Sequence, residues 1–270
     1  MNTQLKLVSY NLCKGGNRNY QTWTALFDSL TPDIFLAQES SPLAEYIAAK
    51  TQPFRPPTNN PVLWAQAGDN YWGSAVFVRA GTLTPLPPLE YFAGWVVGAE
   101  VSGLPTPDGS TAPLHIYSIH TPAPHQVNTA SGKPLYTYAE VVGKILNGIQ
   151  EQSTGATLVI GGDFNITISA RQPNEKPENK PGEREIFDRL REQFGLINCW
   201  QTCHPTTPLE RTLRHLHNPD SKPYHGDGLF VPAAWQAALR RCDILTQPFS
   251  DPPSDHNAIQ AIFEYDTPVA

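Results

Sequence analysis

The sequence is poor in cysteine and in charge, and it contains no long apolar run. Its four cysteines are too few and too scattered for a disulfide framework in 270 residues, so we expect free thiols. No apolar stretch approaches the ~20 residues that cross a bilayer, and the N-terminus begins a strand-like pattern instead of a secretion signal. These absences predict a soluble protein of the cytoplasm that makes no use of a membrane.

Positive charge is scarce as well. Lysine and arginine number 19 against 25 aspartates and glutamates, and the formal net charge is −6. This balance argues against a broad basic face that holds nucleic acid through many phosphates. It still allows a small basic patch, or attraction of phosphate groups by a bound cation.

The chain does contain many short runs rich in valine, isoleucine and aromatic residues, most of which end at glycine, proline, asparagine or aspartate. We expect strands at 5–11, 33–40, 73–80, 95–103, 114–121, 156–165, 227–232 and 257–265. Apolar residues at helical spacing predict helices within 20–30, 134–152 and 183–195. Strands interleaved with helices favour an α/β layered fold, and no linker divides the chain, so we expect one domain over 1–270.

Polar side chains stand where these predicted strands begin or end. They are Asn11, Glu39, His120, Asp163, Asn165, Asp227, Asp255 and His256. Such residues at strand ends are typical of a site that loops build on a rigid sheet. Because they are spread over nearly the whole length, the entire chain is needed if they form one site.

The chemistry of this set points to phosphate esters. Glu39, Asp255 and Asn11 offer hard oxygen ligands, which suit Mg²⁺ or Mn²⁺. Asp163 and Asn165 lie two residues apart on a strand, so both point to one side, where one can polarise a water and the other can steady a phosphate oxygen.

The two histidines fit the same chemistry. His256 follows Asp255 and has Asp227 as a candidate partner, a pattern typical of a carboxylate-oriented imidazole. His120 offers a second proton donor. Each motif alone has an ordinary structural explanation, since Asp-x-Asn after two glycines is a common turn and an Asp-His pair is commonly at the surface. It is the joint pattern that indicates a function.

The order of these motifs resembles the endonuclease/exonuclease/phosphatase superfamily, which includes deoxyribonuclease I, exonuclease III and the inositol polyphosphate phosphatases. The resemblance spans Leu5 to Phe263. It is carried by SYN, AQES, SIHTP, GGDFN, GDGLFV and SDHNAI, which end in or contain the polar residues named above.

The resemblance implies a fold and an activity. The fold is a four-layer α/β sandwich, with two packed, mainly antiparallel sheets flanked by helices. The activity is that of a metal-dependent hydrolase of phosphate esters, a phosphodiesterase or nuclease using in-line attack by water. The alternative is a phosphatase of a sugar, nucleotide or inositol phosphate. The substrate is then a phosphate ester, with nucleic acid among the candidates, and the protein is expected to act as a monomer.

The resemblance also implies roles for the metal ligands. Glu39 matches the principal ligand of Mg²⁺ or Mn²⁺, Asn11 lies beside it, and Asp255 matches a carboxylate at the edge of the metal site.

Five further residues match catalytic positions. Asp163 corresponds to the group that orients and deprotonates the attacking water, and Asn165 to a donor that positions water or a phosphate oxygen. His256, paired with Asp227, corresponds to the imidazole that binds the phosphate. His120 matches the histidine that serves the leaving group in the deoxyribonuclease I-like members.

Some residues depart from the family pattern. Two serines follow Glu39, which makes an abasic-site endonuclease less favoured, and Gly226 and Gly228 stand where many relatives have bulky residues. Loops that could select the substrate carry aromatic and basic residues whose alternative role is packing or a polar surface. They are Arg18, Tyr71, Trp72, Arg211, Arg214, His215 and His217.

Two other classes of function remain open. Cys199, Cys203 and His204 could belong to a metal or haem site, although the three-residue gap between the cysteines is longer than in either usual motif. A catalytically silent binding module with the same fold is the other class.

Overall fold

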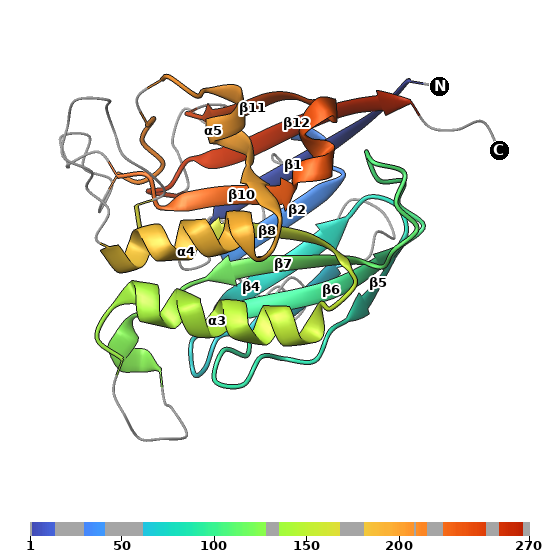
Figure 1. Cartoon of the computed structure of the whole chain (residues 1–270). Helices are drawn as coiled ribbons and strands as arrows, with labels where there is room; N and C mark the ends of the chain where they lie inside the picture. The colour runs from blue at the N-terminus through green and yellow to red at the C-terminus, as the bar shows by residue number, and fades with distance from the viewer. Residues whose placement is uncertain are drawn as a thin grey trace, which may run out of the picture.

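The computed structural model describes residues 2–13, 30–40, 62–127, 135–167, 181–207, 209–214, 224–246 and 254–266. Two six-stranded sheets pack against each other (Figure 1). The first has the order β11-β12-β1-β2-β4-β3. Its strands are Leu239–Leu245, Ala258–Asp266, Asn2–Asn11, Ile34–Ser40, Gly73–Val78 and Val62–Gln66 in that order.

The second sheet has the order β5-β6-β7-β8-β10-β9. Its strands are Thr82–Pro85, Val96–Ser102, Leu114–His120, Thr157–Asp163, Asp227–Pro232 and Leu196–Asn198 in that order. Each sheet has a single parallel pair, β1 with β2 and β7 with β8, and every other pairing is antiparallel. The predicted fold class, two packed and mainly antiparallel sheets with helices outside, is therefore confirmed. One domain over 1–270 stays a prediction.

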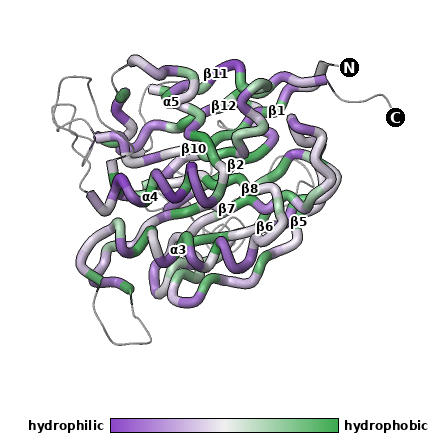
Figure 2. Tube along the Cα trace, in the orientation of Figure 1, coloured by the Kyte–Doolittle hydropathy of each residue, from purple (hydrophilic) through white to green (hydrophobic). Residues whose placement is uncertain are grey.

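The inner faces of the two sheets form one apolar core. Alternate residues of neighbouring strands, such as Leu7 of β1, Leu36 of β2 and Ile116 of β7, are fully buried there. Figure 2 shows this distribution, with hydrophobic strands in the interior and hydrophilic residues along α4 (Pro181–Glu192). Because side chains of a strand alternate between its faces, the polar residues that end these strands on the same face also point into the space between the sheets.

Two helices cover the outer face of the second sheet. α3 (Tyr138–Gln152) begins with a capping box, in which Thr137 accepts a hydrogen bond from the backbone of Glu140 and Glu140 accepts one in return. Its buried stripe includes Ile145 and Ile149, and it packs beside α4. The short elements are η1 (Pro124–Gln126), α5 (Cys199–Cys203) and η3 (Ala233–Ala238). No helix in the described ranges is long and apolar enough to span a membrane.

The outer face of the first sheet carries its own apolar cluster, which includes Val8, Phe35 and Phe77. The helix predicted over 20–30 lies outside the described residues apart from Leu30, which is helical and packs against this cluster.

All eight predicted strands are present, and the sequence did not predict four others, β3, β5, β9 and β11. These four strands are the outermost strands of the two sheets. An edge strand has only one neighbour and is less enclosed, so its sequence needs less apolar character. The exposed residues of β5 and the arginines of β11 agree with this reason.

Candidate active site

Strand register brings three of the candidate residues together on the second sheet. His120 at the end of β7 pairs with Asp163 at the end of β8, and Asp163 pairs with Asp227 at the start of β10. Residues in register point to the same face. All three are buried, and apolar residues on the same face of these strands, Ile116, Val159 and Leu229, belong to the core between the sheets. The three side chains therefore face the first sheet.

Asn11 and Glu39 come from the parallel pair of the first sheet. Asn11 is in register with Gln38, so regular alternation would turn the next residue, Glu39, away from Asn11. Glu39 instead has a φ of 48°, and the pairing of β2 with β4 is irregular between Ala37 and Ser40. This break in the strand re-aims the carboxylate, as β-bulges do next to active sites. Glu39 Oε1 lies 3.4 Å from Asn11 Nδ2 and 3.4 Å from His120 Nε2.

The residues of the first sheet and those of the second sheet meet in the space between the sheets. Asn11 Nδ2 donates a hydrogen bond to Asp163 Oδ2 over 3.0 Å and lies near Glu39 at the same time. His120 Nε2 lies 3.8 Å from Asp163 Oδ2. Glu39 and Asp163, which the sequence separates by more than a hundred residues, thus share one site.

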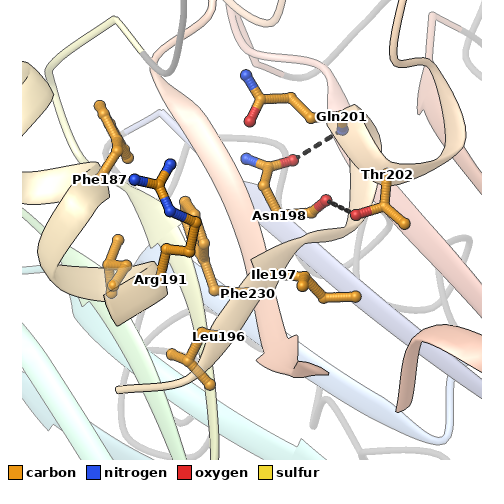
Figure 3. A pocket seen from close by; sticks show the side chains of 9 residues that line it. Phe187, Arg191, Leu196, Ile197, Asn198, Gln201, Thr202 and Phe230 are labelled. Atoms are coloured by element: carbon orange, nitrogen blue, oxygen red, sulfur yellow. Dashed lines mark hydrogen bonds between the residues drawn. The ribbon is translucent and has the colours of Figure 1, made fainter. Parts of the chain in front are cut away.

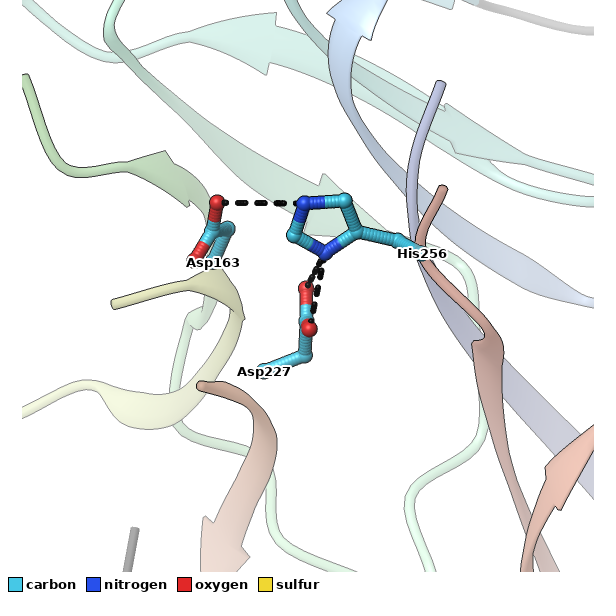
Figure 4. Close-up of side chains that lie close together, drawn as sticks. All are labelled: Asp163, Asp227 and His256. Carbon is cyan, nitrogen blue, oxygen red and sulfur yellow. Dashed lines mark hydrogen bonds and ion pairs between the residues drawn. The ribbon is translucent and has the colours of Figure 1, made fainter. Parts of the chain in front are cut away.

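The imidazole of His256 lies between the carboxylates of Asp227 and Asp163, which both belong to the second sheet (Figure 4). Its Nδ1 lies 3.1 Å and 3.0 Å from the two oxygens of Asp227, and its Nε2 faces Asp163 Oδ2 at 3.9 Å. The Asp255 carboxylate lies 4.0 Å from the same Nε2 and is the most exposed member of this group. All eight residues predicted from the sequence therefore lie at one end of the two sheets; their roles stay predictions.

Asn165 fixes the carboxylate of Asp163. Its φ is 52°, a left-handed conformation that asparagine tolerates better than most residues. Its backbone N–H donates to Asp163 Oδ1 over 2.9 Å, and its side-chain amide donates to Asp163 Oδ2 over 3.3 Å and to the Thr121 carbonyl over 3.1 Å. Asp163 is thereby held with a defined orientation.

The two glycines before Asp163 are required by close packing. A Cβ on Gly162 would lie 1.8 Å from the carbonyl oxygen of Ile119, and one on Gly161 would lie 2.6 Å from both Leu36 and Leu229 side chains. Strand β8 can therefore lie this close to its neighbours only with glycine at both positions.

Burial and neighbouring charges separate the proton affinities of Asp163 and His256. Burial, with the Asp227 carboxylate beside it, raises the pKa of Asp163 to about 6, against the opposing effect of His256 and His120. Burial alone would lower the pKa of His256, but the attraction of Asp227 and its hydrogen bond raise that pKa to about 10. At neutral pH the site therefore holds a carboxylate base beside an imidazolium donor, a division of roles that acid–base catalysis uses.

We expect Asp227→Asn to lower the pKa of His256 toward its ordinary value of 6.5. The pKa of His256 is higher in the folded than in the unfolded state, so its ion pair stabilises the fold below pH 6.5, and that stabilisation is lost as the pH rises through about 10. The variant should therefore also be less stable at pH 7. NMR titration of the imidazole in metal-free protein measures the pKa, and an unchanged titration in the variant would contradict the pairing.

Part of the site fits a divalent cation. Glu39 Oε2 is buried and has no hydrogen-bond partner, which is the state of a carboxylate oxygen left for a cation. Asn11 presents its Nδ2 to the carboxylates, while its Oδ1 accepts a hydrogen bond from the backbone of Cys13 over 2.9 Å. To act as an oxygen ligand, Asn11 would have to turn its amide.

A second group could also hold an ion. Asp163, Asp227 and His256 each offer one ligand atom, and these atoms lie within 4.8 Å of one another. The Nδ1 atom of His256 is already engaged by Asp227. The elevated pKa of His256 means that a cation would have to displace a proton there. A cation therefore meets less competition at Glu39.

The structure adds residues that the sequence analysis did not single out. Ser254 Oγ donates to the carbonyl oxygen of Asn11 and accepts from the backbone N–H of His256 over 3.0 Å, and so ties the two segments together. Below the site, Gln38 Nε2 donates to Ser118 Oγ over 2.9 Å across the two sheets. The sequence signal for these residues was a polar side chain on the inner face of an otherwise apolar strand. Ser118, for example, lies two positions before His120 and therefore points to the same face.

Two tryptophans enclose His120. The ring centroids of Trp72 and Trp95 lie 5.4 Å and 5.3 Å from that of His120. Trp72 is buried and therefore packs, whereas the side chain of Tyr71 is 58% exposed. Among the basic residues of the loops, Arg18, His215 and His217 lie outside the described residues. Arg214 donates from Nη1 to Asn257 Oδ1 over 2.6 Å.

Two further expectations have clear outcomes. Cys199, Cys203 and His204 do not form a metal-binding group among the described residues, and His204 Nε2 is 2.8 Å from the carbonyl oxygen of Cys242. The space beside Gly226 is filled by Tyr224, whose ring would lie 2.7 Å from a Cβ at that position.

No protein-family profile matches the chain, and a search of curated proteins finds no match. Solved structures do match. The AP endonuclease LMAP from Leishmania major superposes with a TM-score of 0.71 at 12% identity, over 97% of this chain and 88% of that chain. An AP endonuclease from Archaeoglobus fulgidus gives 0.69 at 13% identity, over 96% and 99%.

A third similar structure is the 3′ phosphatase NExo from Neisseria bound to a product DNA hairpin, with a TM-score of 0.69 at 17% identity, over 97% of this chain and 100% of that chain. These identities are low, so the similarity establishes a shared fold. The resemblance noted in the sequence is confirmed at that level.

Proposed function

We propose that this chain is a divalent-metal-dependent hydrolase of phosphate esters, a phosphodiesterase or nuclease in which water attacks phosphorus in line with the leaving group. The observation that carries the proposal is the convergence of Glu39 from one sheet with Asp163 and the Asp227–His256 pair. AP endonucleases and a 3′ phosphatase with the same fold support this class of reaction.

Asp163 is proposed as the base. The carboxylate is buried and held by Asn165 and Asn11, so its lone pairs have a fixed direction. With a pKa of about 6 it is deprotonated at neutral pH, yet more basic than an ordinary aspartate. A base with these properties can accept the proton of an attacking water.

His256 is proposed to bind a phosphoryl oxygen. Asp227 engages Nδ1 and keeps the ring protonated, which leaves the Nε2 N–H as the donor that faces the centre of the site. Asn165 is proposed to add a second donor when substrate displaces one of its present hydrogen bonds. One preorganised donor to the developing charge is commonly worth ~3 kcal/mol of barrier.

His120 is proposed to protonate the leaving oxygen. Its Nε2 lies between the carboxylates of Glu39 and Asp163, and both tryptophans hold its ring. An imidazole in this position can donate a proton to a leaving oxygen bound beside the carboxylates.

Glu39, with Asn11 and Asp255, is proposed to hold Mg²⁺ or Mn²⁺. When bound, the ion would withdraw charge from the phosphate and stabilise the leaving oxygen. The unpartnered Oε2 of Glu39 supports this set, and the Asn11 side chain lies 3.4 Å from its Oε1. The expected cytoplasmic location and monomeric state rest on the sequence alone.

A phosphatase is the second candidate. One similar structure is a 3′ phosphatase, and the acidic net charge fits a small phosphate ester better than a long polynucleotide.

A substrate panel tests the proposal. Purified protein with Mg²⁺ or Mn²⁺ is assayed on plasmid DNA, single-stranded DNA, RNA, bis-p-nitrophenyl phosphate and p-nitrophenyl phosphate, each with and without EDTA. We expect EDTA-sensitive cleavage of diesters. Release from monoesters alone would favour the phosphatase, and hydrolysis that EDTA does not affect would contradict the metal requirement.

A further inference from the structure

A cavity lies away from the candidate active site, on the outer face of the second sheet (Figure 3). It encloses about 260 Å³ between α4, β9, β10 and the start of α5. Phe187, Phe230 and Leu196 supply apolar walls, and the amide side chains of Asn198 and Gln201 stand on the opposite side. The cavity therefore has one apolar side and one side that forms hydrogen bonds.

Asn198 carries an unpartnered donor in this cavity. The residue is 9% exposed, and its Oδ1 accepts a hydrogen bond from the backbone N–H of Gln201 over 3.0 Å, which caps α5. Its Nδ2 is buried and has no hydrogen-bond partner. In Figure 3 this nitrogen points into the pocket. A buried N–H without an acceptor is destabilising, so an acceptor on a ligand would satisfy it.

The charge of the cavity favours a neutral ligand. Arg191 is the only ionisable residue among those that line it. Its Nη2 lies 2.7 Å from Asp188 Oδ1 and 2.8 Å from Glu192 Oε1, so its charge is already compensated. A phosphate or another anion would gain little here.

The size and the walls favour a single planar ring. The volume lies slightly below the ~300 Å³ at which pockets for larger ligands begin. The rings of Phe187 and Phe230 are nearly parallel, at 16° with centroids 6.2 Å apart, and offer flat apolar surface. The amide side chains of Asn198 and Gln201 line the cavity, and asparagine and glutamine amides recognise the edges of nucleobases through hydrogen bonds.

We propose that this cavity binds the ring of a nucleobase, a small neutral heterocycle that presents a carbonyl oxygen to Asn198 Nδ2. This goes beyond the proposed phosphoesterase function and does not depend on it. The cavity wall also touches a residue next to the candidate active site: Phe230 packs edge to face against Phe164, with ring centroids 5.3 Å apart, and Phe164 lies between Asp163 and Asn165 in the sequence.

Titration of the protein with uracil, followed by backbone amide NMR, tests the proposal. We expect saturable shifts at residues around Asn198 and Phe230. Asn198→Asp keeps the oxygen that caps α5 but replaces the donor, and it should weaken binding about tenfold or more, the effect of one lost hydrogen bond. Gln201→Ala should weaken binding as well. The matched control is Gln236→Glu, which makes the same amide-to-acid change on an exposed residue outside the cavity.

The base could come from a free nucleoside or from a nucleic acid strand, and comparison of uridine with oligouridylate separates these sources. Tighter binding of the oligomer that Asn198→Asp abolishes indicates a strand, and equal binding indicates a free ligand. The proposal is overturned if uracil gives no saturable shifts, if benzene binds as well as uracil, or if both Asn198→Asp and Gln201→Ala bind uracil like the wild type.

Discussion

Asp163→Asn is expected to lower kcat for phosphodiester hydrolysis by about two orders of magnitude or more. The substitution preserves the size of the side chain but removes the base, and proton transfer by a positioned base contributes ~10²–10⁴-fold. The fold should survive. Burial raises the pKa of Asp163 to about 6, so the deprotonated carboxylate reduces stability at neutral pH, and a neutral amide removes that cost.

Two measurements separate the effects of this substitution. Steady-state kinetics with bis-p-nitrophenyl phosphate gives kcat, and thermal unfolding gives stability, which we expect to be unchanged or higher. Asp69→Asn, at an exposed turn, is the matched control. Turnover close to wild type in a folded Asp163→Asn protein would remove Asp163 from the mechanism.

Glu39→Gln is expected to have an effect of similar size through metal binding. The change keeps the shape of the side chain but removes the charge of the carboxylate whose Oε2 has no other partner. Activity at limiting Mg²⁺ should fall about 100-fold, because the ligand is removed and because His120 Nε2 loses the carboxylate that lies 3.4 Å away.

The loss should depend on the metal concentration. Raising Mg²⁺ or Mn²⁺ should restore part of the activity of Glu39→Gln, and titration calorimetry should show weaker Mn²⁺ binding. Glu151→Gln on the exposed side of α3 is the control. Equal Mn²⁺ affinity in the Glu39→Gln and wild-type proteins would exclude Glu39 as a ligand.

The central strands could be predicted from the sequence because they are enclosed on both faces. Residues 114–120 are buried throughout in β7, and the run of apolar side chains reflects that. The edge strands could not be predicted in this way. In β5 most residues are exposed, and β9 is only three residues long, so neither contains a pattern long enough to recognise.

The members of the site could also be predicted, but not their arrangement. Strand ends mark Asn11, Asp163 and Asp227, whereas register determines that the last two are neighbours. The orientation of Glu39 was beyond prediction, since it depends on a φ of 48° within an irregular strand pairing. The cavity was missed because its walls come from α4, β9, β10 and α5, which pack together only in the folded chain.

The most direct test of the account is the position of a divalent cation in crystals soaked with Mn²⁺. Glu39, Asn11 and Asp255 are the proposed ligands, while Asp163, Asp227 and His256 form the other group that could hold an ion. We predict an anomalous peak beside the Glu39 carboxylate, with the hydrogen bonds between His256 and Asp227 intact. A peak bound by Asp163 and His256 instead, or none near Glu39, would contradict it.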